Sequence, residues 1–231
     1  MNLNGLDIEI KRSNRTKTLS INIERDGSVN VIVPSDLEES KIMEIVKSKE
    51  YEIHKQITKN KELNKERIDR KFVPGQSFLY LGKSYNLHID EEQAETLKLR
   101  NGKFILASKS IDKAEEVFIK FYKKMGKPIL EKRVTFFKEF IKEKPNELKI
   151  VDLKTRWASC TPSGNLNFHW KCFMAPLSVL DYLIVHELVH LKHLNHSRQF
   201  WDEVSIIIPD YKIHEEWLRK NGVKMTLKDN Y

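Results

Sequence analysis

The chain has 231 residues, of which 40% are hydrophobic and 32% are charged, and its formal net charge at pH 7 is +8. This composition is too apolar for a disordered protein and too charged for a membrane bundle, and no apolar run reaches the roughly 18–20 residues of a membrane span. Two cysteines, Cys160 and Cys172, are too few for a disulfide framework, and the N-terminus lacks a signal-peptide core, so we expect a cytoplasmic protein with no membrane partner.

The first part of the chain is predicted to form strands with one helix among them. Apolar and polar residues alternate on both sides of Asp26-Gly27 between residues 19 and 33, which predicts a β-hairpin. Ser35 or Asp36 is then expected to cap a helix. A second group of strands is expected over residues 78–81, 85–89, 97–99 and 104–106.

From about residue 111 the hydrophobic period becomes helical. One apolar stripe continues through an expected kink at Gly126–Pro128. Two strands should follow over residues 148–157 and 165–170. Pro176 then suits the first position of another helix.

These patterns predict an α+β protein in two parts. We expect a β-rich N-terminal region over residues 1–110 and an α+β domain over residues 111–231. The positive charge is uneven, because residues 101–150 hold 13 basic and 7 acidic side chains. A basic helix face over residues 113–144 is therefore a possible contact for nucleic acid, although lysine-rich faces are more often simply solvated.

The most informative segment is His186-Glu187-Leu188-Val189-His190, which follows an apolar run. Two imidazoles and a carboxylate on a buried helix are costly without partners, and a metal ion removes that cost. Positions i and i+4 lie about 40° apart around a helix and about 6 Å along it, so His186 and His190 can bind one zinc ion. Glu187 is rotated by about 100° from His186, so it flanks the ion and can act as general base toward a water that the metal activates.

A hydrolytic zinc site needs a third protein ligand and one open position. His193 lies about 10.5 Å along the helix from His186, which is too far for a straight helix. Asn195 tolerates the left-handed conformation that ends helices, so the chain can turn back and present His196. We assign His196 as the third ligand and place His193 beside the ligands. The alternative ligands are later carboxylates: Glu203, Glu215 and Glu216.

Several further residues have possible roles around this site. Ser197 is a natural cap for a helix over residues 198–207. Tyr211 and His214 could stabilise an oxyanion. Arg156 could orient a substrate carbonyl, or it could pair with an acid such as Asp181. The strand over residues 165–170 is a candidate edge for binding an extended peptide, and Cys160 and Cys172 are weak candidates for a metal because no second pair completes a tetrahedral set.

Six segments of the chain together form a pattern that can be compared with known families. They are Arg156–Cys160, Asn165–Asn167, Ala175-Pro176, His186–Trp201, Pro209–Lys212 and Trp217-Leu218. Together they resemble the YgjP-like metallopeptidase family, which is related in its catalytic helix to SprT-like and WLM-type proteases. The resemblance implies a zincin-like C-terminal domain, with the catalytic helix against a small sheet. It also implies that His186, His190 and His196 bind zinc and that Glu187 is the base. Ala158 stands where the family pattern has glycine.

We therefore predict a zinc metallopeptidase that acts on protein or peptide substrates. The alternative is a zinc-stabilised accessory protein that associates with nucleic acid and has little or no peptidase activity. Glu187 favours catalysis, because a structural zinc ion has no use for a base and usually has a closed fourth position.

Overall fold

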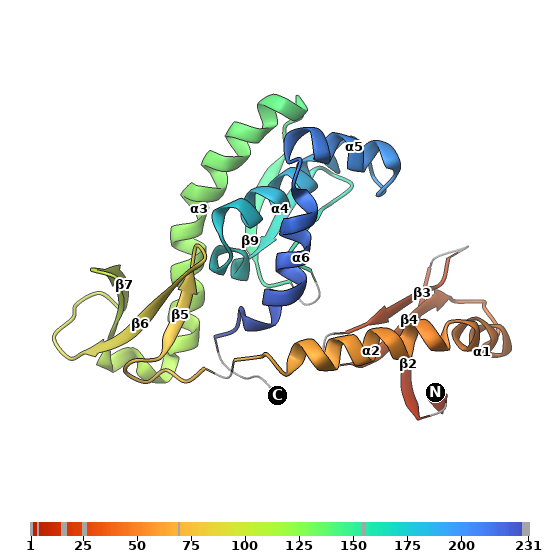
Figure 1. The fold of residues 1–231 in the computed structure, drawn as a ribbon, viewed down its shortest axis with the longest axis horizontal. Coiled ribbons are helices and arrows are strands. Elements are labelled where there is room, and N and C mark those ends of the chain that lie inside the picture. Colours follow the sequence, from red (N-terminus) through yellow and green to blue (C-terminus); the bar gives the residue numbers. More distant parts are fainter. Residues whose placement is uncertain are drawn as a thin grey trace. The chain divides into compact units, whose positions relative to one another are not determined.

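The computed structural model describes residues 2–3, 5–14, 18–24, 27–68, 70–153 and 156–227. The chain forms two compact units, Met1–Arg67 and Ile68–Tyr231, which are coloured red to orange and orange to blue in Figure 1. Within the described part of the chain, every helix is too short or too polar to cross a membrane.

The first unit is one sheet with two helices. Its elements are β1 (Asn2–Leu3), β2 (Leu6–Ser13), β3 (Ser20–Ile23), β4 (Val29–Pro34), α1 (Glu39–Ser48) and α2 (Glu50–Asn64). The strand order is β1-β2-β4-β3, and β3 pairs with β4 in antiparallel register from Ser20↔Ile32 to Ile23↔Val29. The predicted hairpin is thus confirmed, although Asp26 of its turn lies outside the described residues.

The first helix of this unit, α1, begins later than the sequence predicted. The residue before α1 is Glu38, which makes no side-chain cap hydrogen bond, so the cap expected at Ser35 or Asp36 is wrong. Ile42 and Val46 on α1 are fully buried in the same core as Val31 and Val33 of β4. Burial of this apolar face, rather than a cap, therefore sets the position of the helix.

The second unit has two small sheets and four helices among its described residues. The first half contains β5 (Ser77–Tyr80), β6 (Lys83–Asp90), β7 (Leu97–Arg100), β8 (Lys103–Ala107), the 3-10 turn η1 (Ser108–Lys113) and α3 (Ala114–Ile141). The second half contains β9 (Glu147–Val151), β10 (Ala158–Cys160), β11 (Asn165–His169), η2 (Trp170–Met174), α4 (Leu177–Val189), α5 (Arg198–Ile207), α6 (Tyr211–Asn221) and η3 (Gly222–Lys224). The molecule is therefore mixed α+β, as predicted.

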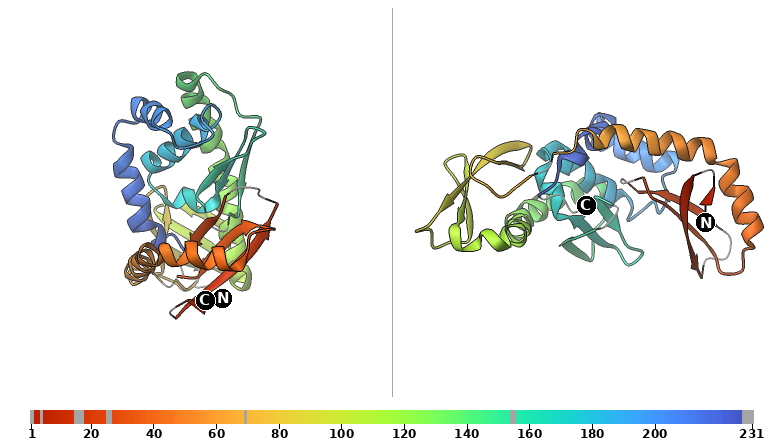
Figure 2. Two further views of the ribbon diagram at one scale, coloured as in Figure 1. Left: turned by 90° about the vertical axis from the view of Figure 1, so that its right-hand side faces the viewer. Right: turned by 90° about the horizontal axis from the view of Figure 1, so that it is seen from below.

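The boundary between the units differs from the division we expected between residues 110 and 111. The ring of Phe118 on α3 lies 4.5 Å from that of Phe78 and 5.1 Å from that of Phe104. The sheet of β5–β8 therefore shares its hydrophobic core with α3, and it belongs to the second unit rather than to the first. Figure 1 shows α3 extending from this sheet toward α5, and the views in Figure 2 agree.

Two glycines let neighbouring elements approach the start of α4 closely. Gly82 has a φ of 78°, and a Cβ there would lie 2.9 Å from Pro176. A Cβ on Gly126 of α3 would lie 2.5 Å from the ring of Phe173. The helix continues through Pro128. The close packing at Gly126 holds α3 against η2, the turn that leads into α4.

The sheet beside α4 has the order β10-β11-β9, with β11 antiparallel to β10 and parallel to β9. The strand expected over residues 148–157 ends at Val151, and β10 begins only at Ala158, on the other side of β11. Because β11 has a partner on each side, our expectation that residues 165–170 form an edge is wrong. The edge strand that packs against α4 is β10.

Candidate metal centre

The helix that carries the histidine motif is buried on almost every side. Leu180, Ile184, Val185, Leu188 and Val189 are fully buried, as the apolar run predicted. Its first turns are tied to α3, because Arg133 donates two hydrogen bonds to Asp181, of 2.6 and 2.7 Å. This ion pair therefore anchors α4 to α3 at a point before the histidine motif.

Three histidine side chains converge at the end of α4. The Nε2 atom of His196 lies 3.0 Å from Nε2 of His186 and 3.1 Å from Nε2 of His190. Bonds of about 2 Å to one zinc ion place ligand atoms roughly 3–3.5 Å apart, so this spacing fits such an ion. Among the described residues, these three histidines form the one group of at least three possible ligand side chains close enough to share an ion.

The chain reaches His196 through a turn that differs from our expectation. The backbone N–H groups of Lys192 and His193 both donate to the carbonyl oxygen of Val189, which ends α4 in a tight turn. Asn195 does not adopt the left-handed conformation that we predicted for it. The helix end is thus closed by its own last turn.

His193 supports the group through its backbone and points its ring elsewhere. Its carbonyl oxygen accepts a hydrogen bond of 2.9 Å from Nδ1 of His190, which leaves Nε2 of His190 as the unprotonated ring nitrogen. The ring of His193 lies 2.9 Å from Glu203, which also accepts a 2.7 Å hydrogen bond from Lys192. Glu203 is therefore engaged away from the three histidines.

The other two alternative ligands are also outside this group. Glu216 pairs with Arg219 and Lys220 on the same helix. Neither Glu215 nor Glu216 joins the convergent side chains in the described part of the chain. No carboxylate ligand is therefore indicated by the geometry.

Burial keeps the histidines of α4 in the form that binds metals. Burial, with a smaller contribution from the positive forms of His190 and His196, lowers the pKa of His186 to about 3. The pKa of His190 is also lowered, mainly by burial. Neutral imidazole is the ligand form of histidine, so both rings are ready to coordinate a cation.

Glu187 is a buried acid beside this group. It is 5% exposed, and its Oε2 atom has no hydrogen-bond partner among the described residues. Burial raises the pKa of Glu187 to about 8, against smaller opposing effects of the Arg156 charge and the backbone N–H of Cys160. A buried carboxylate with one oxygen atom unpaired is costly in free energy, and a nearby cation would offset that cost.

Aromatic rings that we did not predict surround the histidines. The ring of Phe200 lies 4.9 Å from His186, 4.6 Å from His190 and 4.8 Å from His196. Phe200 is held at the start of α5, where its N–H donates to the side chain of Ser197, so the predicted cap and helix are confirmed. The aromatic pair Phe200-Trp201 directly after that cap was the available sequence signal.

The remaining predicted side chains lie around the site without joining the histidine group. Arg156 is exposed, and Asp181, which we considered as its partner, pairs with Arg133 instead. Tyr211 stacks on Trp201 at 5.1 Å between ring centroids. His214 lies 3.5 Å from Asp210, and both cysteines are free thiols.

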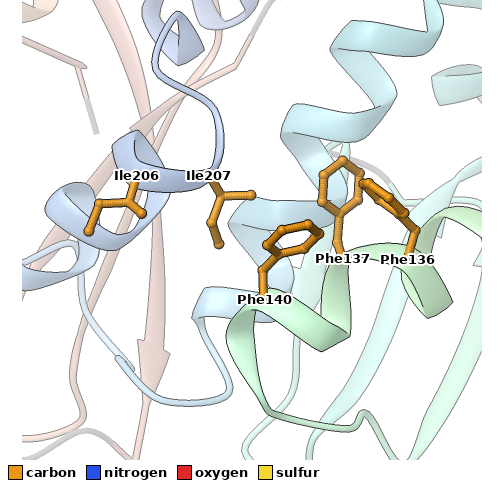
Figure 3. A pocket seen from close by; sticks show the side chains of 5 residues that line it. All are labelled: Phe136, Phe137, Phe140, Ile206 and Ile207. Atoms are coloured by element: carbon orange, nitrogen blue, oxygen red, sulfur yellow. The ribbon is translucent and has the colours of Figure 1, made fainter.

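An apolar groove of about 300 Å³ separates the end of α3 from the end of α5. Figure 3 shows its lining side chains, Phe136, Phe137, Phe140, Ile206 and Ile207. All five are hydrocarbon side chains, so the groove offers no acid, base or ligand atom. It is therefore distinct from the chemistry at the three histidines.

The sequence of the chain is similar to that of one known family. The sequence model of the YgjP-like family, described as a metallopeptidase domain, matches residues 17–221. No curated protein matches the chain. A crystal structure of the metallopeptidase zymogen of Pyrococcus abyssi abylysin is 23% identical, with a TM-score of 0.38 over 42% of this chain and 99% of that chain. A likeness at this level does not place any residue.

Proposed function

The chain belongs to the YgjP-like metallopeptidase family, and from that premise we propose that it is a zinc-dependent peptidase with a zincin-like second unit. The observation that carries the proposal is the convergence of three imidazole nitrogens next in sequence to a buried carboxylate, that of Glu187, whose Oε2 atom has no hydrogen-bond partner among the described residues. His186, His190 and His196 would hold the ion, and three nitrogen ligands leave one position open for a substrate or water.

Glu187 is the proposed general base. When bound, zinc supplies Lewis-acid chemistry and makes water a nucleophile at neutral pH. The carboxylate of Glu187 would accept the proton of the attacking water and pass it to the leaving amine. A cation at the three histidines favours the charged form of Glu187, as does Arg156. Glu187 follows the ligand His186 directly on α4 and interacts with the N–H of Cys160 on the edge strand β10, which suits this role.

We propose that an extended substrate binds along β10. The carbonyl of Trp157 and the N–H of Thr161 bond to β11, at 2.7 and 2.9 Å. Because backbone groups alternate in an antiparallel pair, those of Ala158 and Cys160 face away from β11. The N–H of Cys160 in fact interacts with Glu187. A peptide that paired with Ala158 would therefore pass beside the base, with little sequence preference.

The other roles predicted around the site stay proposals. Tyr211 and His214 are candidates for stabilising the developing oxyanion, and Arg156 for orienting the substrate carbonyl. The free thiols of Cys160 and Cys172 fit a cytoplasmic location. No contact or side-chain arrangement among the described residues favours the alternative of a nucleic-acid accessory protein.

The test is cleavage of a peptide library derived from a proteome. Zinc-loaded wild type should cleave it, chelated wild type should not, and added zinc should restore the activity. Glu187→Gln is the matched control, because it keeps the shape of the side chain and loses the proton acceptor. Equal cleavage by wild type and Glu187→Gln would exclude the proposed mechanism, and no cleavage by any zinc-loaded sample would exclude the peptidase.

A further inference from the structure

A stack of aromatic rings connects two of the candidate zinc ligands. The rings of His196 and Trp201 lie 5.5 Å apart with 23° between their planes, and those of Trp201 and Tyr211 lie 5.1 Å apart with 18° between them. Tyr211 faces Tyr182 at 6.4 Å and 21°, and Tyr182 meets His186 at 5.8 Å. The stack therefore begins at His196, crosses α5 and α6, and returns to α4.

His196 needs support that the histidines of α4 already have. His186 lies on the buried helix α4, and His190 is the residue directly after its end, where its Nδ1 is fixed by the carbonyl of His193. His196 is exposed and lies outside any helix. Within the described part of the chain, its ring makes hydrogen-bond-distance contacts only with the other two histidines, through Nε2. Its ring also meets the rings of Phe200 and Trp201.

We infer that Trp201 is a positioning residue for His196, an inference that rests on the proposed metal site. The indole face lies nearly parallel to the imidazole and limits its rotation, while Tyr211 holds the indole from the other side. The ligand is thus oriented before an ion arrives, which lowers the entropic cost of binding. A stacked aromatic pair changes an equilibrium constant by roughly 3- to 10-fold, and metal affinity should depend on Trp201 to that extent.

The experiment measures zinc affinity by chelator competition in the full chain. Trp201→Ala should bind zinc roughly 3- to 10-fold more weakly than wild type, and Trp201→Phe, which keeps a ring face, should lose less. Trp217→Ala is the matched control, because Trp217 is a partly buried indole on α6 that packs on the same core. It should bind zinc as wild type does. In a His196→Ala background, Trp201→Ala should cause no further loss, because it acts through His196.

Each outcome decides the inference. Equal affinity in Trp201→Ala and Trp217→Ala would overturn it, and so would the same loss in the presence and absence of His196. If Trp201→Ala does not fold, Trp201→Phe decides by the same comparison: a loss that disappears in the His196→Ala background supports the inference, and a loss that persists overturns it. Failure of wild type to bind zinc would instead refute the proposed function, and this inference with it.

Discussion

The two halves of the metal centre are built in different ways. On α4, the spacing of the helix places His186 and His190 on one face, and burial holds the helix. After α4, an irregular segment brings His196 to the same point, where it is exposed and contacts mainly rings. A regular element can thus place ligands by sequence spacing alone, whereas a ligand on a turn depends on contacts with side chains of the helix that follows it.

The largest expected effect comes from the helical half. His190→Ala should lose stoichiometric zinc, because the remaining imidazoles supply one nitrogen from α4 and one from the turn. Elemental analysis of the purified variant checks this. A full equivalent of zinc in His190→Ala would show that the ion binds elsewhere.

Glu187 shares the helix but should be separable from metal binding. Glu187→Gln should keep zinc and a melting temperature near that of wild type, because the side chain is not a ligand in the histidine group. Peptidase activity should fall by roughly 10²- to 10⁴-fold, the usual contribution of a general base. Parallel zinc and activity assays measure both quantities, and loss of zinc would show that this carboxylate coordinates the ion.

Substitutions in the turn should weaken zinc binding less than substitutions of the helical ligands. His196→Ala should lower zinc affinity by at least about 10-fold, and His193→Ala by less, because His193 contributes its backbone carbonyl to His190 rather than its ring. Chelator competition ranks the two variants. The reverse order would transfer the ligand role to His193.

The smallest effect on zinc should come from the ion pair that holds the start of α4. Asp181→Asn weakens the contact with Arg133 and should lower the free energy of unfolding by about 1–2 kcal/mol. Zinc affinity should stay within about twofold of wild type, because the helix still spaces its two histidines. Denaturant unfolding measures the change in the free energy of unfolding, and chelator competition measures the zinc affinity. A tenfold loss of affinity would show that α4 is less rigid than its burial indicates.

The sequence predicted the features that depend on local spacing. The hairpin of β3 and β4, the apolar helix before His186 and the cap at Ser197 follow from periodicity and from residue type. His196 lies close to His186 and His190, and the turn that brings it there uses Val189 as acceptor and not a left-handed Asn195.

The features that the sequence did not predict depend on long-range contacts. The sequence did not predict that β11 pairs with a strand on each side. The alternation of apolar and polar residues indicates a strand, but it does not reveal how many neighbours that strand has. In the same way, no local pattern shows that Arg133 pairs with Asp181, 48 residues away. The stacking of Trp201 on Tyr211 joins two helices and was equally hidden.

X-ray absorption at the zinc edge tests the central claim most directly, because it counts the atoms bound to the ion. Wild type should show three imidazole nitrogens at about 2.0–2.1 Å and no sulfur, and His196→Ala should show two. A sulfur at about 2.3 Å in wild type, or three imidazoles retained in His196→Ala, would contradict the account.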